Sequence, residues 1–364
     1  MKKILAALTL TALLCTAGGP ALAVDDTASA WAKDSLEQAE ALGFVPQRLQ
    51  ADYARNITRE EFASISMNFL AAQYGYGSTN EYYAVLAYQA EQDPEAPQVT
   101  AGAFSDFTGM DVGWANALGI VNGRGDGTFD PDGAITRQEA AAMLCRAYAV
   151  YGGEPEGGDG QFDATFSDAG QVAPWAKGEA EAIWSLGVMG GTDQGLFAPL
   201  GGYTREQCIV TFLRLWQSAP VGRAQENVKP LASPDDVIAA MIAGNGSLFP
   251  FTVDQRMDTP SCTVLYGAYS GGPHGSYYHI FLVYPDGGCR DVMTGHVPYQ
   301  NVWYTIPAAE ELALSEDQST LTFAVTYREK EVHFSTGEVI HEAGVYQFSV
   351  DLASGAVTTE FTAM

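Results

Sequence analysis

Positive charge is scarce in this sequence. The 364 residues contain 18 lysines and arginines against 44 aspartates and glutamates, which gives a formal net charge of -26. No cluster of lysine and arginine occurs along the chain. A protein that binds nucleic acid or anionic lipid through its overall field needs the opposite balance. Nucleic acid and anionic membrane surfaces are therefore excluded as general partners, and an anionic polymer would need a few local cations.

Long apolar runs are also missing, with one exception at the start of the chain. Two lysines precede an apolar run over 4–16, and the small-x-small sequence over 21–23 follows, which is typical of a cleaved secretory signal peptide. We therefore expect residues 1–23 to be removed on export. No later stretch approaches the roughly 18 apolar residues of a membrane span, so no membrane contact is expected after this cleavage.

Cysteine and histidine are rare, with five of each. Cys145 and Cys208 lie in apolar helical runs and are predicted to be buried thiols. Cys262 and Cys289 could form a disulfide, which the spacing alone does not decide. The histidines all follow residue 270, and none forms a helical zinc-binding pair; a nucleophile elbow is absent too. No metal, cofactor or catalytic residue is therefore predicted.

One helix–loop–helix plan occurs three times over 24–220. In its clearest copy a helix ends at Gly119, a glycine-rich loop follows, and Thr136 with Glu139 has the capping-box spacing of a new helix. The plan recurs over 187–207 and, more loosely, over 43–61. A repeated unit with one apolar helical face implies that neighbouring copies bury each other's surfaces.

The loop of this clearest copy superficially resembles a calcium-binding loop. Counting from Asn122, however, Arg124 occupies the third position and Gly133 the twelfth, where such a loop places an oxygen ligand and a bidentate glutamate. A cation in place of a ligand argues against calcium, so no metal site is predicted here.

The spacing of the copies sets the expected domain boundaries. The first unit is assigned to 24–90, with a tyrosine-rich segment over 74–88 that either extends its last helix or adds another. The second unit covers 101–151 and is short in its first helix, and the third covers 163–220. A proline-containing linker and an acidic, glycine-rich linker separate them.

The pattern changes after residue 230. One short helix is expected over 235–243, followed by strands with hairpin-type turns at 285–288 and 353–355. The expected strands are 263–269, 277–284, 321–327, 345–352 and 356–361. Residues 231–364 are therefore predicted to form a separate, mainly antiparallel α+β domain, which makes the chain an α+β multidomain protein with an all-α first part.

An arginine directly follows the threonine cap in each unit: Arg59, Arg137 and Arg205. The positive end of a helix dipole disfavours a cation by about 0.3–1 kcal/mol, so three such arginines at matched positions need a reason. An anion held by the guanidinium fork and the free N–H groups of the first helical turn is one explanation. An internal salt bridge to Asp106 or Asp168 is the other.

Trp31 and Trp175 occupy equivalent positions in units one and three, equally far before the glycine that ends the first helix, Gly43 or Gly187. Their flat faces would suit a sugar ring. A tryptophan that opens an amphipathic helix is nevertheless more often part of the core, where it buries a large apolar area. The position alone therefore favours the core.

Taken together, these motifs resemble the S-layer homology repeat of bacterial surface proteins. Phe-x-Asp, Trp-Ala, Gly-(Ile/Val)-x-x-Gly, Gly-x-Phe-x-Pro and Thr-Arg-(Glu/Gln)-(Glu/Gln) occur in register over roughly residues 30–218. The resemblance implies a pseudo-threefold helical bundle at the cell wall, whose grooves bind secondary cell-wall polysaccharide that typically carries a pyruvyl ketal. The candidate polysaccharide-binding residues are Arg59, Arg137, Arg205, Trp31, Trp175, Asp106 and Asp168.

The expected function is thus non-covalent anchoring of an exported, non-enzymatic protein to the cell wall, with the C-terminal domain displayed for an unknown ligand. Unit one lacks the Gly-x-Phe-x-Pro loop and unit two lacks the aligned tryptophan. Fewer than three working sites are therefore expected, with Arg205 of the complete third unit preferred. The alternative is a wall-associated hydrolase, which a pocket in 231–364 joining histidine with aspartate or cysteine would favour.

Overall fold

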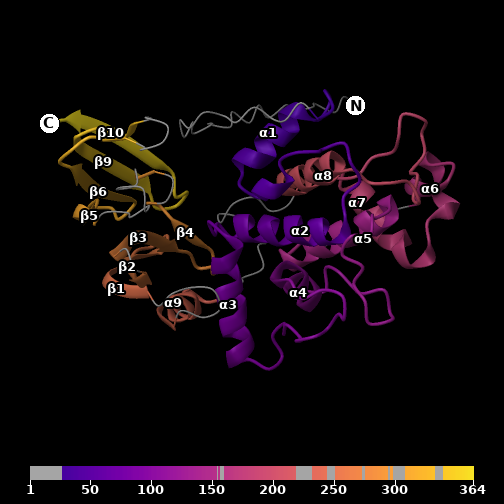
Figure 1. Ribbon diagram of the computed structural model, residues 1–364, viewed down its shortest axis with the longest axis horizontal. Coiled ribbons are helices and arrows are strands. Elements are labelled where there is room, and N and C mark those ends of the chain that lie inside the picture. The colour runs from indigo at the N-terminus through magenta and orange to yellow at the C-terminus, as the bar shows by residue number, and fades with distance from the viewer. Residues whose placement is uncertain are drawn as a thin grey trace, which may run out of the picture.

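A computed structural model describes residues 27–153, 155, 160–218, 232–243, 251–272, 275–293, 296–297, 308–332 and 339–364. The predicted signal peptide lies outside these residues. The part up to residue 218 is helical and the later part consists mainly of antiparallel sheets, so the chain is α+β overall. Figure 1 shows α3 in the middle, with the sheets and α9 on one side of it and the other labelled helices on the other side.

The helical part contains short helices before each loop and long ones after it. Its elements are α1 (Lys33–Ala41), η1 (Gln47–Leu49), α2 (Arg59–Gln73), α3 (Thr79–Gln92), α4 (Met110–Ala117), α5 (Arg137–Val150), α6 (Gln161–Thr165), η2 (Ala169–Gln171), η3 (Pro174–Ala176), α7 (Lys177–Ser185) and α8 (Arg205–Ser218). Thr58 and Thr136 form complete capping boxes at α2 and α5, as predicted. The tyrosine-rich segment adds the separate helix α3.

Matching backbone contacts join the three units in a ring. In each unit, the backbone N–H of the arginine that begins the long helix donates a hydrogen bond to a backbone carbonyl of the next unit. The accepting residue lies four positions before the arginine of that next unit. These hydrogen bonds run from Arg59 to Gly133, from Arg137 to Gly201 and from Arg205 back to Arg55, at 3.0, 3.1 and 2.9 Å. Each long helix therefore begins on the loop of a neighbouring unit.

The three loops share an unusual backbone conformation. Asp52, Asp130 and Ala198 each lie seven residues before their unit's arginine, and their φ angles are 50°, 62° and 54°. Positive φ is uncommon outside glycine. The first unit therefore forms the same turn as the other two, although it lacks the Gly-x-Phe-x-Pro sequence.

The C-terminal part has one helix and three sheets among the described residues. Its elements are α9 (Pro234–Ala243), β1 (Phe251–Asp258), β2 (Thr263–Gly272), β3 (Gly275–Val283), β4 (Cys289–Asp291), β5 (Glu310–Leu314), β6 (Thr320–Tyr327), β7 (Glu331–Val332), β8 (Val339–His341), β9 (Gly344–Asp351) and β10 (Val357–Ala363). The antiparallel orders are β1-β2-β3-β4, β10-β9-β6-β5 and β7-β8. The five predicted strands are confirmed within a few residues, while β1, β4, β5, β7 and β8 were missed.

The first sheet is covered on both faces. One face, with Val264 and Ile280, packs against Phe323 and Val350 of the second sheet in a shared apolar cluster. The other face, with Phe281, belongs to the same continuous core as α9 and the helical units. The secondary structure therefore changes between the two parts, but the core of the helical part continues into the first sheet.

The four cysteines that the structure describes are buried and form no disulfide. Cys145 and Cys208 are buried thiols as predicted, and burial raises the pKa of Cys145 to about 11. Cys262 and Cys289 belong to different core clusters on opposite faces of the first sheet, which keeps their sulfurs apart. Among the described helices, none is long and apolar enough to cross a membrane.

Candidate functional site

The three candidate arginines lie buried where the units meet, with exposed fractions of 6% for Arg59, 9% for Arg137 and 3% for Arg205. Arg59 donates from Nε to the carbonyl of Phe129, and Arg137 donates to that of Phe197, both at 2.8 Å. Each of these two guanidinium groups also lies over the phenylalanine ring, 4.8 and 5.5 Å from its centroid. These arginines thus bind the next unit's loop through its backbone and its aromatic side chain.

The Arg205 junction uses a carboxylate in addition. Arg205 Nη2 donates to Glu61 Oε1 at 2.9 Å, and both side chains are buried. Arg55 pairs with the same carboxylate. Arg205 also donates to the carbonyl of Ala51, the counterpart of Phe129 and Phe197 in the other loops. The charge of Arg205 is therefore compensated within the fold.

The residue equivalent to Glu61 differs between the junctions. In the unit whose loop receives Arg59 it is Glu139, in the first turn of α5, and Arg124 pairs with it at 3.0 Å. In the unit whose loop receives Arg137 it is Gln207, in the first turn of α8, which has no charge. Among the described residues neither Arg59 nor Arg137 forms an ion pair.

Burial therefore lowers the pKa of both guanidinium groups. Loss of hydration lowers the pKa of Arg59, and the nearby positive charge of Arg124 lowers it further, against partial opposition from Glu139. Loss of hydration likewise lowers the pKa of Arg137. Tyr203 and Asp168 oppose this effect at Arg137, but both arginines donate hydrogen bonds to backbone carbonyls, and a buried cation without an ion pair attracts an anion.

The two candidate tryptophans are half exposed, 55% for Trp31 and 53% for Trp175. The preference for the core is therefore wrong at both positions. The chain path explains the exposure of Trp175: Ala173, two residues earlier, donates its N–H to the side chain of Gln138 at 2.9 Å. Gln138 directly follows Arg137, so this bond attaches the segment just before Trp175 to the first turn of α5.

The same arrangement occurs at Trp31. Ser29, two residues earlier, donates from its N–H and hydroxyl to the carboxylate of Glu206 at 2.9 and 2.8 Å. Glu206 directly follows Arg205. At the remaining junction, Glu60 follows Arg59 but pairs with Arg48 instead. At two of the three junctions, the residue that follows the arginine therefore holds a segment that leads into a tryptophan.

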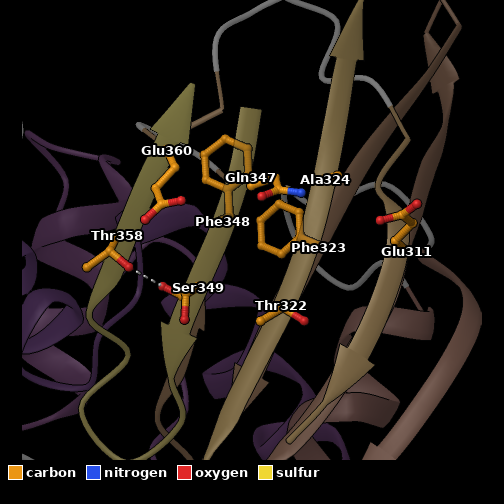
Figure 2. Close-up of a pocket in the computed structure, with 9 residues that line it drawn as sticks. All are labelled: Glu311, Thr322, Phe323, Ala324, Gln347, Phe348, Ser349, Thr358 and Glu360. Carbon is orange, nitrogen blue, oxygen red and sulfur yellow. Dashed lines mark hydrogen bonds between the residues drawn. The ribbon is translucent and has the colours of Figure 1, made fainter. Parts of the chain in front are cut away.

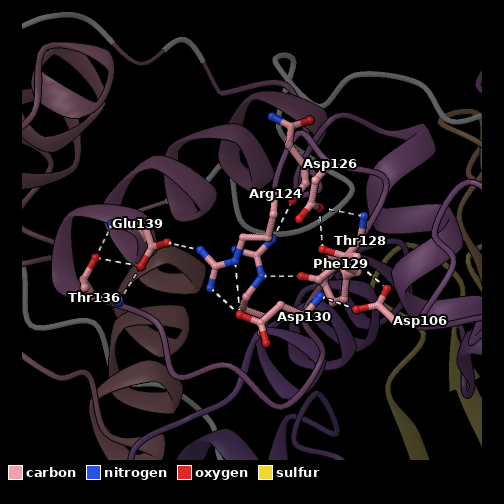
Figure 3. Close-up of polar contacts among 10 residues, drawn as sticks. Asp106, Arg124, Asp126, Thr128, Phe129, Asp130, Thr136 and Glu139 are labelled. Atoms are coloured by element: carbon pink, nitrogen blue, oxygen red, sulfur yellow. Dashed lines mark hydrogen bonds and ion pairs between the residues drawn. The ribbon is translucent and has the colours of Figure 1, made fainter.

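The candidate aspartates hold the loops in place. Asp106 accepts the backbone N–H groups of Phe129 and Asp130, both at 2.8 Å, and Asp168 accepts the equivalent pair in unit three. Figure 3 shows Asp106 bound to the loop in this way. The N–H of Phe129 lowers the pKa of Asp106. The alternative of an internal salt bridge is therefore confirmed at Arg205, where Glu61 is the partner, whereas in the described part of the chain Asp106 and Asp168 form no ion pair with the helix-start arginines.

The loop of unit two also bounds an open hollow of about 520 Å³ lined by Asp106, Asp126 and Asp130. Arg124 bridges Asp130 at 2.8 Å and Glu139 at 3.0 Å, so part of this acidity is neutralised internally (Figure 3). Across the described residues, no three or more side chains of histidine, cysteine, aspartate and glutamate are grouped so that they could hold a metal ion.

The outer face of the second sheet forms another hollow, of about 280 Å³. It is lined by hydroxyl, amide and carboxylate side chains of β6, β9 and β10, including Thr322, Gln347 and Glu360 (Figure 2). The rings of Phe323 and Phe348 stack 4.7 Å apart beneath these side chains. The sequence pattern gave no indication of this polar face as a site.

Two stretches of the chain, 111–141 and 165–208, match the family model of the S-layer homology domain. They include two of the candidate arginines, Arg137 and Arg205. The first unit lies outside the matched stretches, in keeping with its divergent loop. S-layer homology sequence of this kind supports attachment at the bacterial cell surface.

Similar proteins include an amylopullulanase of Thermoanaerobacterium thermosulfurigenes, 28% identical over 54% of this chain, and the exoglucanase XynX of Acetivibrio thermocellus, 26% identical over 54%. A surface layer protein of Brevibacillus choshinensis is 27% identical over 36% of the chain. The similarity covers only 10%, 16% and 11% of these relatives' lengths. Residues 111–141 and 165–208 of the chain therefore carry S-layer homology sequence.

Proposed function

We propose that this chain anchors itself non-covalently to the cell wall by binding an anionic, pyruvylated secondary cell-wall polysaccharide. In this proposal the three units form a pseudo-threefold bundle, supported by the ring of matching hydrogen bonds that returns from Arg205 to the first loop. The chain would act as an attachment module rather than an enzyme, and its β region would be the displayed part.

The observation that carries the proposal is the unequal charge compensation at the three junctions. Arg137 is buried without an ion-pair partner among the described residues, and the segment just before the exposed Trp175 is hydrogen-bonded to Gln138, the residue that follows Arg137. A carboxylate-bearing sugar needs both features, a cation for its charge and a flat apolar face for its ring. The Arg137–Trp175 junction therefore becomes the primary polymer site.

The other two junctions each lack one of these features. Arg205 is close to Trp31 but already pairs with Glu61, and it is the most buried of the three arginines. Arg59 forms no ion pair in the described part of the chain, but no tryptophan there accompanies it. Arg205, which the sequence favoured, therefore ranks below Arg137 as a ligand contact. In this proposal Asp106 and Asp168 do not contact the polymer but fix the loop conformation through their hydrogen bonds to backbone N–H groups.

The proposal is tested by co-sedimentation of the full chain with purified wall sacculi, before and after chemical removal of the secondary polymer. We expect sedimentation with intact walls and its loss with stripped walls. Trp175→Ala should weaken sedimentation at least tenfold while leaving the melting temperature unchanged, because the ring is exposed. Trp31→Ala is the matched control and should have the smaller effect. Equal sedimentation on intact and stripped walls would refute the proposal.

A further inference from the structure

A cavity of about 320 Å³ lies where α3 meets the first sheet. One wall comes from the turn before α3 and its first helical turn, including Gly77, Ser78 and Glu81, and the other from Arg290, Asp291 and His296. The cavity is at the lower end of the size range of pockets that hold small ligands, about 300–1,000 Å³. It lies apart from the arginine junctions and belongs to no S-layer homology motif.

The two walls are fixed to each other by direct hydrogen bonds. The N–H of Cys289 donates to the carbonyl of Tyr74 at 3.0 Å. The hydroxyl of Tyr76 donates to the carbonyl of Gly287 at 2.8 Å. The cavity is therefore a built feature of the junction, with both walls attached to the shared core.

Asp291 is positioned by its neighbours. Its Oδ2 lies 2.7 Å from Nδ1 of His279, and its Oδ1 accepts the N–H of Met293 at 2.9 Å. The His279 ring is itself held in place, stacked on Phe281 and in edge contact with Tyr269. Asp291 thus presents a fixed carboxylate at the cavity.

Glu81 is the second carboxyl group and has no ion pair among the described residues. It accepts the N–H of Gly77 at 3.0 Å. Burial and, to a smaller extent, the charge of Asp291 raise the pKa of Glu81 to about 7, although the hydrogen bond from Gly77 and the nearby His279 act in the opposite direction. The fold therefore keeps an ionisable acid in a place where its negative charge is unfavourable without a nearby cation.

The same cavity also offers positive and donor groups. Arg290 lines it next to Asp291, and the first turn of the 14-residue helix α3 opens onto it at Ser78. Helix N-terminal N–H groups and a guanidinium both favour a carboxylate. His296 also lines the cavity, and burial, together with Arg290, lowers its pKa. Acidic and basic groups thus face one space that is too small for a polymer.

We propose that this cavity binds a small zwitterion, a free amino acid or a dipeptide, with its ammonium group at Glu81 and Asp291 and its carboxylate at Arg290 and the start of α3. An ammonium group beside Glu81 supplies the missing cation, so Glu81 releases its proton when the ligand binds near neutral pH. Binding at this cavity is independent of attachment to the cell wall.

The test is isothermal titration calorimetry of the full chain at pH 7, in two buffers with different heats of ionisation. The probes are glycine and glycylglycine, which separate a free amino acid from a dipeptide. Saturable binding of either, with a dissociation constant in about the millimolar range and release of up to one proton, is expected. Glycinamide and N-acetylglycine each lack one of the two charges and should bind at least tenfold more weakly.

Glu81→Gln should lose at least tenfold in affinity and abolish the dependence on buffer. Glu91→Gln, at the exposed far end of the same helix, is the matched control and should bind like the unaltered chain. His296→Asn gives a second variant should Glu81→Gln fail to fold, with an expected loss of about fivefold. Absence of saturable heat with both zwitterions, or equal binding of N-acetylglycine and glycine, would overturn the proposal.

Discussion

The Arg137 and Arg205 junctions begin from the same sequence motif and differ in the charge that faces the arginine. In both helices a threonine cap is followed by the arginine. Arg137 donates to the carbonyl of Phe197 and Arg205 to that of Ala51, which occupy equivalent positions in their loops. Arg205 additionally meets the carboxylate of Glu61, whereas the equivalent residue opposite Arg137 is Gln207. One side-chain difference therefore separates an internally neutralised junction from one that can attract an anion.

Removing the cation from the compensated junction should have the largest effect. Arg205→Met leaves the buried carboxylate of Glu61 with only the half-exposed Arg55, and breaking a buried ion pair typically costs about 3–5 kcal/mol. Urea denaturation of the full chain measures the free energy of unfolding. Arg48→Met, which removes the exposed pair with Glu60, is the control and should cost less than about 1 kcal/mol. Similar losses in both variants would contradict the assignment.

The same change at the other junction should cost less stability and more binding. Arg137→Met removes donors from the carbonyls of Phe197 and Gly190 but leaves no unpaired charge, so we expect a loss of about 2 kcal/mol. Sedimentation with intact wall sacculi should fall at least tenfold. If Arg205→Met instead lost more binding than Arg137→Met at equal folded fraction, the ranking of the two junctions would be reversed.

Much of this arrangement could be predicted from local sequence. The threonine caps, the loops and the repeat spacing depend on neighbouring residues, so Thr58 and Thr136 were identified correctly. The Glu61 and Gln207 difference was also visible in the sequence. Its meaning was hidden because the arginine that faces each position comes from another unit, and its main acceptors are backbone carbonyls, which carry no sequence signal.

The contacts of the aspartates and of the β region could not be predicted from local sequence either. Asp106 and Asp168 were candidates for polysaccharide binding, with pairing to an arginine as the alternative, yet they accept the backbone N–H groups of Phe129 and Phe197 in the loops of their own units. The three-residue strand β4 and the docking role of α3 depend on contacts between distant segments. The cavity around Glu81 joins the turn before α3 to Arg290, Asp291 and His296 of the β region, and local sequence motifs do not reveal such a contact between distant segments.

The junction between α3 and the first sheet also contains a buried ionisable group, the carboxyl group of Glu81. Because the folded-state pKa of Glu81 is raised to about 7, its protonated form favours the fold. Its contribution to stability is complete below the unfolded pKa near 4.5 and is lost as the pH rises through 7. Between pH 5 and pH 8, the unaltered chain should lose on the order of 1–2 kcal/mol relative to Glu81→Gln.

This pH prediction is measured by urea denaturation at both pH values. Glu91→Gln serves as the control and should follow the unaltered chain at each pH. A stability difference between Glu81→Gln and the unaltered chain that stays constant from pH 5 to pH 8 would contradict the raised pKa.

A single substitution at residue 207 tests the difference between the Arg137 and Arg205 junctions most directly. Gln207→Glu places a carboxylate opposite Arg137 without changing the size of the side chain. Gln207 Oε1 already accepts the N–H of Thr204 at 3.1 Å, and a glutamate oxygen can keep this capping bond. The substitution should stabilise the chain by up to about 1 kcal/mol, because it compensates a buried cation.

The same substitution should weaken sedimentation with intact walls, because the new carboxylate competes with the polymer for Arg137. Gln207→Ala is the matched control: it removes the cap without adding charge, so it should lower stability and leave binding nearly unchanged. Unequal compensation predicts that stability and wall binding change in opposite directions in Gln207→Glu. If both rise together, the carboxylate supports the site rather than blocking it, and the neutral residue at 207 cannot be the reason that Arg137 is available to an anion.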